Sequence, residues 1–306
     1  MKIVNKFISN FRGQLTANKD ILLLDFGSGN TKLYKQGKLI SSKQSSFLEL
    51  SNNQYQKIHL VDHGTIINFD LAANFLNNLL QSLVKNNEIS SNFVGHYLSP
   101  EGLTQVEQLI IKKVLGALKY GNWKIVTKKN FYNTNVGLVF DIGFDSTEVV
   151  LGISSNIPEA RTIKFGSSSF TETIRKVVRD NHQLELSWQS AEKIKKEIVG
   201  EDFLLAINKS KQKITVRGKD IYTFVPKTLV IDAKIFQEPL LGRVEELFEE
   251  IKLFFSKIST NQLMNSIEGG LELWGEGAKL AGMSQFFSKK LQTTVKVANP
   301  SYEVSK

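Results

Sequence analysis

The segment that decides the fold is residues 22–34, LLLDFGSGNTKLY, in which an apolar run ends at Asp25 and a glycine-bearing turn follows. Residues 138–153, LVFDIGFDSTEVVLGI, repeat this order around Asp141. Each segment predicts a β-hairpin whose tight turn exposes backbone N–H groups and hydroxyls that can hold phosphate. The aspartate can hold a hydrated Mg²⁺, or it can simply cap its own turn. Together with a small-residue turn in residues 270–283, GLELWGEGAKLAGM, the two hairpins predict one nucleotide site.

The order of these three segments resembles the phosphate-1, phosphate-2 and adenosine motifs of the actin fold. Further stretches narrow the resemblance to the MreB-like proteins, the rod-shape-determining bacterial actins. Residues 62–84 resemble the segment that crosses into the core of the family's first domain, and residues 98–122 resemble the helix before its second half. Residues 190–200 resemble its nucleoside-contacting helix, and residues 216–231 resemble the hairpin that follows. The match runs from about residue 21 to about residue 300.

The resemblance implies an α/β protein with the actin-like ATPase fold, in which two similar α/β domains lie on either side of a nucleotide cleft. It assigns residues 16–142 and 268–306 to domain I, and residues 143–267 to domain II. Strands that alternate with helices along the chain indicate the same layered architecture. The outer part of domain I is expected to be reduced, because little chain separates Ser51 from Asp62.

Apolar periodicity predicts the individual elements within this frame. Helices are expected at residues 75–84, 106–120, 170–180 and 237–257, with a further helix that begins at Ser190. Residues 94–98 and 214–232 are expected to be β, and residues 51–57 are expected to form a polar connection.

The resemblance implies ATP and Mg²⁺ as cofactors, and it assigns site residues by position. The β- and γ-phosphates would lie between two turns, one formed by Gly27, Ser28, Gly29, Asn30 and Thr31, the other by Gly143, Phe144, Asp145, Ser146 and Thr147. The backbone beside the adenine would be that of Gly275, Glu276, Gly277 and Ala278. Glu192, Lys195 and Lys196 would approach the ribose and base, unless they belong to a solvated charged face. Asp25 and Asp141 would hold Mg²⁺ through water.

The chain departs from the family pattern at positions that bear on the chemistry. Phe144 and Asp145 stand where the family's second turn has two glycines, and Glu276 replaces a glycine of the third motif. An inward-pointing Asp145 would repel phosphate, because two unit charges ~4 Å apart interact by about 4 kcal/mol at an effective dielectric constant of ~20. Residues 127–135, TKKNFYNTN, contain no acid where the family has a water-orienting glutamate. Without such a carboxylate the rate of hydrolysis falls by about 10²–10⁴-fold. ATP hydrolysis is therefore expected to be weak or absent, and no catalytic residue is assigned.

Composition bounds the partners and the compartment. The chain has 306 residues and no cysteine, which excludes disulfides and thiolate metal sites and fits a reducing cytoplasm. No apolar run reaches the ~20 residues that span a bilayer. The net charge of +9 favours acidic partners, whether anionic lipid, nucleic acid or nucleotide, although it can also serve solubility alone.

The first fifteen residues predict a short amphipathic helix. Val4, Phe7, Ile8 and Phe11 fall on one face at 100° per residue, and Lys and Arg flank that face. A basic amphipathic helix with two phenylalanines is typical of a membrane-surface anchor. The alternative is a helix that packs on the body of the protein.

The resemblance therefore implies a cytoskeletal protein that binds ATP and polymerises on the inner face of the cell membrane, where it scaffolds peptidoglycan synthesis and determines cell shape. Its expected location is cytoplasmic and peripheral to that membrane. Its expected partners are further copies of itself in a head-to-tail filament or a second MreB-like subunit, the membrane surface, and cell-wall synthesis and elongation proteins. No nucleic acid partner is expected.

Two other function classes stay open at this point. The chain could be a degenerate actin-like regulator or tether that co-assembles with an intact MreB or with the division machinery, without hydrolysis. It could also be a small-molecule kinase of the same fold, although no recognisable substrate pocket follows the second motif. A heat-shock ATPase is disfavoured because the chain has no substrate-binding domain.

Overall fold

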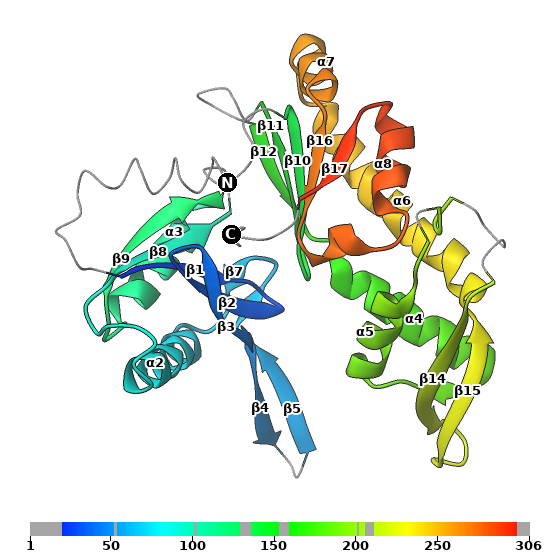
Figure 1. Cartoon of the computed structure of the whole chain (residues 1–306), viewed down its shortest axis with the longest axis horizontal. Helices are drawn as coiled ribbons and strands as arrows, with labels where there is room; N and C mark the ends of the chain where they lie inside the picture. The colour runs from blue at the N-terminus through cyan, green and yellow to red at the C-terminus, as the bar shows by residue number, and fades with distance from the viewer. Residues whose placement is uncertain are drawn as a thin grey trace. The chain divides into compact units, whose positions relative to one another are not determined.

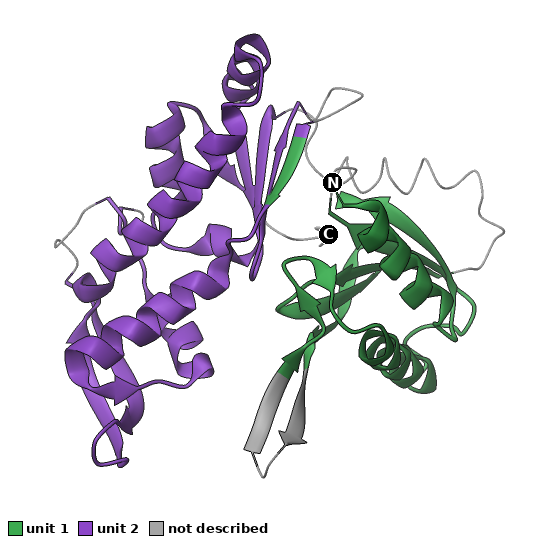
Figure 2. Ribbon diagram, turned by 180° about the vertical axis from the view of Figure 1, so that it is seen from behind, with its two compact units in different colours: residues 1–134, 160–162, 299–306 green, residues 135–159, 163–298 purple. Residues whose placement is uncertain are grey.

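Figure 1 shows the course of the chain in a computed structural model. The structure describes residues 20–51, 54–100, 103–128, 136–152, 159–200, 202–205 and 211–298. The chain divides into two compact units, which are coloured separately in Figure 2. Unit 1 is built mainly from residues up to 134, and unit 2 from residues 135–159 and 163–298. The predicted membrane-binding helix, residues 1–15, lies outside the described residues.

Unit 1 contains a five-stranded sheet in the order β3-β2-β1-β8-β9. Its strands are β1 (Ile21–Phe26), β2 (Asn30–Lys35), β3 (Lys38–Gln44), β8 (Val94–Ser99) and β9 (Asn122–Thr127). The predicted hairpin is present, because β1 and β2 pair antiparallel with Asp25 opposite Lys32. On its other side β1 pairs parallel with β8, so β1 lies at the centre and its Leu22 and Leu24 are buried.

Two helices, α2 (Phe69–Lys85) and α3 (Gln105–Gly116), contribute to the core of this unit. Asn68 caps α2 by accepting the Leu71 N–H, which is why this helix begins before the predicted residue 75. Thr104 and Glu107 form a reciprocal capping box that begins α3. Residue 116 ends α3, four residues earlier than expected.

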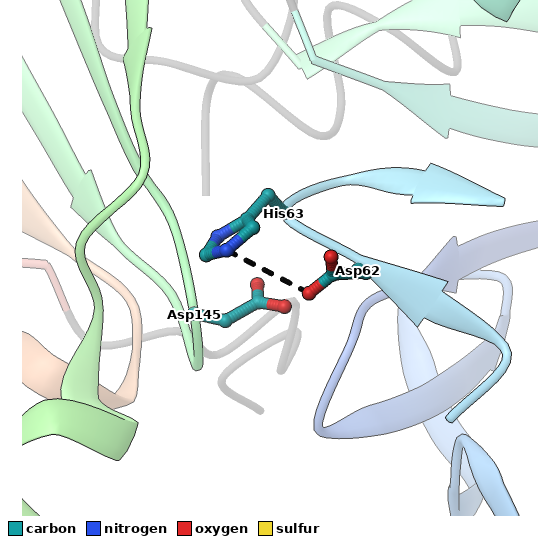
Figure 3. Close-up of side chains that lie close together, drawn as sticks. All are labelled: Asp62, His63 and Asp145. Atoms are coloured by element: carbon teal, nitrogen blue, oxygen red, sulfur yellow. Dashed lines mark ion pairs between the residues drawn. The ribbon is translucent and has the colours of Figure 1, made fainter. Parts of the chain in front are cut away.

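Two small hairpins complete unit 1. Strands β4 (Ser46–Ser51) and β5 (Gln54–His59) pair antiparallel, so the polar connection expected at residues 51–57 is wrong and most of it is a strand. Strands β6 (Val61–Asp62) and β7 (Thr65–Ile66) form the second hairpin. At its turn His63 Nε2 lies 3.7 Å from Asp62 Oδ1, an ion pair when the imidazole is protonated (Figure 3).

The buried histidine of unit 1 predicts a pH dependence of stability. His96 lies on β8, and burial followed by its cross-strand neighbour Lys124 lowers the pKa of its imidazole. The unfolded chain then binds this proton more readily, so the free energy of unfolding is highest above the unfolded pKa of about 6.5 and falls as the pH drops through that value. The urea midpoint should therefore be lower near pH 5 than near pH 7.5. A His96→Leu variant with an unchanged pH slope would assign the effect to another group.

Unit 2 repeats the architecture of unit 1. Its five-stranded sheet has the order β12-β11-β10-β16-β17, formed by β10 (Leu138–Ile142), β11 (Thr147–Leu151), β12 (Glu159–Ile163), β16 (Leu271–Trp274) and β17 (Val295–Val297), and of these strands only β12 has residues, 160–162, that are grouped with unit 1. Strands β10 and β11 form the second predicted hairpin, and β10 pairs parallel with β16 as β1 does with β8. The expectation of two similar α/β halves is thus confirmed.

The observed units differ from the expected domain boundaries at two places, because residues 135–142, which include β10, and residues 268–298 were both expected in domain I and both fall in unit 2. Residues 268–306 were assigned to domain I, but β16 hydrogen-bonds to β10 in the middle of the sheet of unit 2. Leu271 and Leu273 of β16 are buried in the core that Phe140 of β10 also enters. Strand pairing and shared core burial therefore place residues 268–298 in unit 2.

Helices and a second sheet complete unit 2 (Figure 1). They are the α-helices α4 (Ser167–His182), α5 (Trp188–Glu197), α6 (Gln237–Phe255), α7 (Thr260–Glu268) and α8 (Met283–Leu291), the 3₁₀ helices η3 (Ala233–Phe236) and η4 (Glu276–Lys279), and the strands β13 (Leu184–Glu185), β14 (Lys213–Asp220) and β15 (Pro226–Asp232). The α7 helix was not predicted. None of the helices in the described part of the chain has both the length and the apolar character needed to cross a membrane.

Candidate functional site

The first predicted phosphate turn, Gly27 to Gly29, connects β1 to β2 in unit 1. Its backbone is held at one point by Ser45, whose N–H donates to the Gly29 carbonyl at 3.2 Å. The Ser45 hydroxyl also lies 2.8 Å from the hydroxyl of Thr31, and both residues are fully buried. Thr31 therefore supports the turn from inside the protein, whereas Asn30 is exposed beside it.

Asp25, the predicted Mg²⁺ residue of unit 1, already has a cationic neighbour. Lys128 Nζ lies 3.8 Å from Asp25 Oδ1, and both side chains are about one quarter exposed, 24% and 22% respectively. Burial, and next the charge of Asp25, raise the pKa of Tyr97 well above its ordinary value. The Lys128 contact was not predicted from the sequence, because about a hundred residues separate the two side chains along the chain. Residues 129–135 of that segment lie outside the described residues.

The second predicted phosphate turn is built onto the start of α4. The Gly143 N–H donates to the Ser146 carbonyl at 2.9 Å and closes the turn. The carbonyls of Gly143 and Phe144 accept the N–H groups of Ser167 and Ser168, at 2.9 and 2.6 Å. These are N–H groups of the first turn of α4, which have no partner within the helix itself. The backbone of the second turn is therefore attached to a helix.

Two residues beside this turn show how closely it is packed. A Cβ added to Gly166 would lie 2.5 Å from the carbonyl carbon and oxygen of Phe144, so only glycine fits before α4. Thr147 is fully buried, and its hydroxyl donates to the Phe165 carbonyl at 2.7 Å. Thr147 thus supports the second turn from inside, as Thr31 supports the first.

The two residues that replace glycines in this turn are both half-buried. The ring of Phe144 packs against Trp188, the first residue of α5, with 5.9 Å between centroids and 58° between planes. At this position the chain therefore replaces a glycine with a side chain that packs on α5.

Glu192 and Lys195 of α5 form a compact network with the start of α4. Lys195 Nζ lies 2.7 Å from Glu192 Oε1, and it donates to the Ser167 carbonyl at 3.1 Å and to the Thr171 hydroxyl at 2.9 Å. The Thr171 hydroxyl also donates to Glu192. Burial lowers the pKa of Lys195, against the opposing effects of the hydrogen bond and charge of Glu192. Glu276 of η4 acts in the same direction as Glu192, whereas Lys196 is exposed.

The third motif packs directly on the end of β10. Gly275 has φ +85° and ψ 169°, and a Cβ there would lie 2.2 Å from the Ile142 carbonyl oxygen and 2.8 Å from Asp141 Oδ1. A Cβ on Gly277 would lie 2.3 Å from Ile142 Cγ2. The glycines therefore permit contact between η4 and the strand that carries the second turn. Ala278 is buried there.

The acidic residue of the third motif has a partner. Glu276 Oε1 lies 3.0 Å from Lys279 Nζ, and both side chains are about half exposed. Unit 2 thus brings together three of the predicted site segments, namely the second turn, α5 and the glycine motif. The functional groups of these segments are backbone amides, hydroxyls, lysine ammonium groups and carboxylates, which can bind a phosphorylated, hydroxyl-bearing ligand.

The Lys195 network predicts that replacing Lys195 destabilises the protein much more than replacing Lys193 on the same helix. Replacing Lys195 by Ala leaves Glu192 without its cation, and the free energy of unfolding should fall by about 1–3 kcal/mol, less than the full cost for a wholly buried pair. Lys193 also has an ion pair, 3.5 Å to Glu197, but its side chain is 78% exposed. Lys193→Ala on the same helix should change stability by about 0.5 kcal/mol or less. Equal losses in the two variants, measured by urea unfolding, would contradict the network.

The family model described as MreB/Mbl protein matches residues 45–305. The cell shape-determining protein Mbl of Bacillus subtilis (strain 168) is 20% identical over 308 residues, which cover 90% of this chain and 91% of that protein. The cell shape-determining protein MreB of Escherichia coli (strain K12) is 22% identical over 332 residues, 95% of this chain and 91% of that protein.

Two solved structures resemble the fold. MreB5 of Spiroplasma citri bound to ADP has a TM-score of 0.79 at 18% identity, with 93% of each chain covered. The MamK double helical filament has a TM-score of 0.69 at 13% identity, with 94% of this chain and 96% of that chain covered. At these identities the likeness shows the fold, which is the actin-like ATPase fold with two sheet-and-helix domains.

Proposed function

The chain belongs to the MreB/Mbl family, and from that premise we propose that it is an actin-like cytoskeletal protein that binds ATP. The observation that carries the proposal is the convergence in unit 2 of the second turn, the Glu192–Lys195 network and the glycine motif. These are the three segments that the resemblance assigns to the phosphates, the nucleoside and the adenine. MreB5 of Spiroplasma citri, which has the same fold, is described as bound to ADP in one structure and to AMPPNP in another.

The chain's residues suit the nucleotide better than they suit a metal ion. The second turn has a backbone fixed by α4, and Lys195 offers a partly buried cation beside the start of that helix. Asp25 would have to exchange its Lys128 contact for a hydrated Mg²⁺, and Asp141 would be the second carboxylate. When bound, Mg²⁺ would neutralise phosphate charge.

Hydrolysis should be slow or absent. The segment at residues 127–135 has no acid to orient a water molecule, and the Lys128 it contains lies beside Asp25. Nucleotide would then control assembly through binding. The same observations favour the second candidate function, a regulator that co-assembles with an intact MreB without turning over ATP.

The experiment that tests nucleotide binding is a thermal melt with and without millimolar ATP and Mg²⁺, run beside a phosphate-release assay. A ligand at one hundred times its Kd adds about 2.7 kcal/mol of stability, which would raise the melting temperature by several degrees. We expect this rise together with little released phosphate. The absence of any rise would refute nucleotide binding, and phosphate release at the rate of an intact bacterial actin would refute weak catalysis.

Filament formation and membrane attachment complete the proposal. We expect head-to-tail filaments, formed alone or with a second MreB-like subunit, on the inner face of the cell membrane, where they would scaffold peptidoglycan synthesis and set cell shape. MamK, which shares the fold, is described as a double helical filament. We assign the membrane contact to residues 1–15, whose sequence predicts a helix with Val4, Phe7, Ile8 and Phe11 on one apolar face.

Membrane attachment has its own test. Phe7→Glu with Phe11→Glu should abolish flotation with liposomes rich in phosphatidylglycerol, because each buried apolar side chain contributes up to about 1.5–3 kcal/mol and each basic residue about 1 kcal/mol near an anionic surface. Lys2→Gln is the matched control at the same end of the chain and should weaken flotation only slightly. Flotation that persists after both Phe substitutions would place the anchor elsewhere.

A further inference from the structure

The second turn differs from a glycine turn in that a side chain fixes it. Two contacts between its backbone and α4 hold the carbonyls of Gly143 and Phe144. A third contact holds the side chain of Phe144 against Trp188 on α5. A turn with glycine at this position would have only the backbone contacts, because glycine offers no side chain to pack.

Trp188 lies on a helix whose start and whose face towards α4 are fixed by hydrogen bonds. It is the first residue of α5, and the helix begins at Ser187, whose hydroxyl accepts the Ser190 N–H at 3.1 Å. Trp188, Glu192 and Lys195 are spaced by four and three residues, so they lie along one face of the helix. Lys195 ties that face to the Ser167 carbonyl at the start of α4.

These contacts connect the turn, α4 and α5 to one another in a closed cycle. The turn is bonded to α4, α4 is bonded to α5 through Lys195, and α5 returns to the turn through Trp188 and Phe144. The two half-buried aromatic rings have the separation of a favourable tilted pair. If Trp188 were lost, Phe144 would lose this ring contact, and rotamers that carry its ring towards the ligand side of the turn would become more accessible.

We propose that Trp188 is a positioning residue for the phosphate-binding turn: it holds the Phe144 side chain and so keeps the turn's backbone in its binding conformation in place of the missing glycines. The inference rests on the proposed nucleotide binding for its consequence, but the positioning itself is a property of the protein without ligand. Phe144 then departs from the family pattern without changing the conformation of the turn, because Trp188 holds its side chain.

The test uses the full chain with four variants: Trp188→Ala, Trp188→Phe, Phe144→Gly and the Trp188→Ala/Phe144→Gly double variant. The first readout is amide hydrogen exchange without nucleotide at Gly143, Ser167 and Ser168, whose N–H groups form the turn contacts. Trp188→Ala should speed exchange at these amides by about 3- to 10-fold, the range that an aromatic pair supports. Trp188→Phe should restore protection, because it keeps a ring beside Phe144. Unchanged exchange in Trp188→Ala would overturn the inference whatever the nucleotide result.

The second readout is the Kd for ATP, measured by calorimetry on the same proteins. Trp188→Ala should raise the Kd by about 3- to 10-fold, whereas in the Phe144→Gly background the same substitution should have little further effect. An equal rise in both backgrounds would show that Trp188 acts independently of Phe144 and would overturn the inference. Should the unaltered protein fail to bind ATP while exchange responds as expected, the proposed function would fall and the positioning role would stand.

Discussion

Replacing Tyr222 by Ser and Phe224 by Asn should abolish sedimentation of polymers with ATP while leaving the melting temperature nearly unchanged. Both residues lie in the loop between β14 and β15, where Tyr222 is 75%, Phe224 67% and Val225 58% exposed. Because residues 216–231 resemble the family's hairpin, we expect this loop to belong to a surface through which subunits stack. A buried aromatic side chain contributes about 1.5–3 kcal/mol, so the loss of two should raise the critical concentration more than a hundredfold.

The double substitution should leave the fold intact, because the backbone of this loop does not depend on the two aromatic rings. Asp220 accepts the N–H groups of Tyr222 and Thr223, each at 3.0 Å, and this holds the loop without using either aromatic ring. Phe224 has φ +59°, a conformation that Asn adopts more readily than an aromatic residue. The lost contact of Lys219 with the Phe224 ring, 5.1 Å to the centroid, costs only about 0.5–1 kcal/mol at an exposed site.

A matched control separates assembly from a general loss of apolar surface. Met264 on α7 is 54% exposed in the same unit, and Met264→Gln should leave sedimentation unchanged. Polymers that form normally from the double variant would show that this hairpin takes no part in stacking. A large fall in its melting temperature would show instead that the rings support the fold.

The sequence predicted the elements whose structure depends on residues close together in the chain. The two hairpins around Asp25 and Asp141 were predicted because an apolar run, a glycine turn and a second run lie within one short segment. The β4–β5 hairpin was missed because its sequence is rich in Ser, Asn and Gln and reads as a connection. There the backbone ladder, which begins with Ser46 opposite His59, forms the hairpin.

Pairings over long sequence distances could not be predicted in the same way. The partner of β16 is β10, more than a hundred residues earlier, and both strands, which were expected in domain I, lie in the sheet of unit 2. The contacts of Phe144 with Trp188 and of Asp25 with Lys128 are likewise set by packing. The roles of Thr31 and Thr147 could not be predicted either, because a hydroxyl next to a turn can face either a ligand or the protein interior. In the structure both residues are buried.

The glycine motif gives the prediction with the largest effect on stability. Gly275 adopts a backbone region that is essentially restricted to glycine, and its Cβ position lies against the backbone of Ile142. Gly275→Ala should therefore lower the free energy of unfolding by about 3 kcal/mol or more, which corresponds to a fall of about 6–12 °C in the melting temperature of a unit this size. ATP binding should be lost as well, because η4 must move away from the end of β10 to relieve the overlap.

The same substitution at Gly242 is the matched control, with the opposite sign expected. Gly242 lies inside α6 in the same unit, and nothing lies within 4 Å of its Cβ position. Alanine there removes the entropic cost of glycine in a helix, so Gly242→Ala should stabilise unit 2 by about 0.5–1 kcal/mol and leave ATP binding unchanged. The two alanine variants add the same methyl group, so any difference between them comes from backbone conformation and space. If Gly275→Ala melts with the unaltered protein, then η4 does not pack on β10 as described, and the convergence of the third motif with the second turn would have to be abandoned.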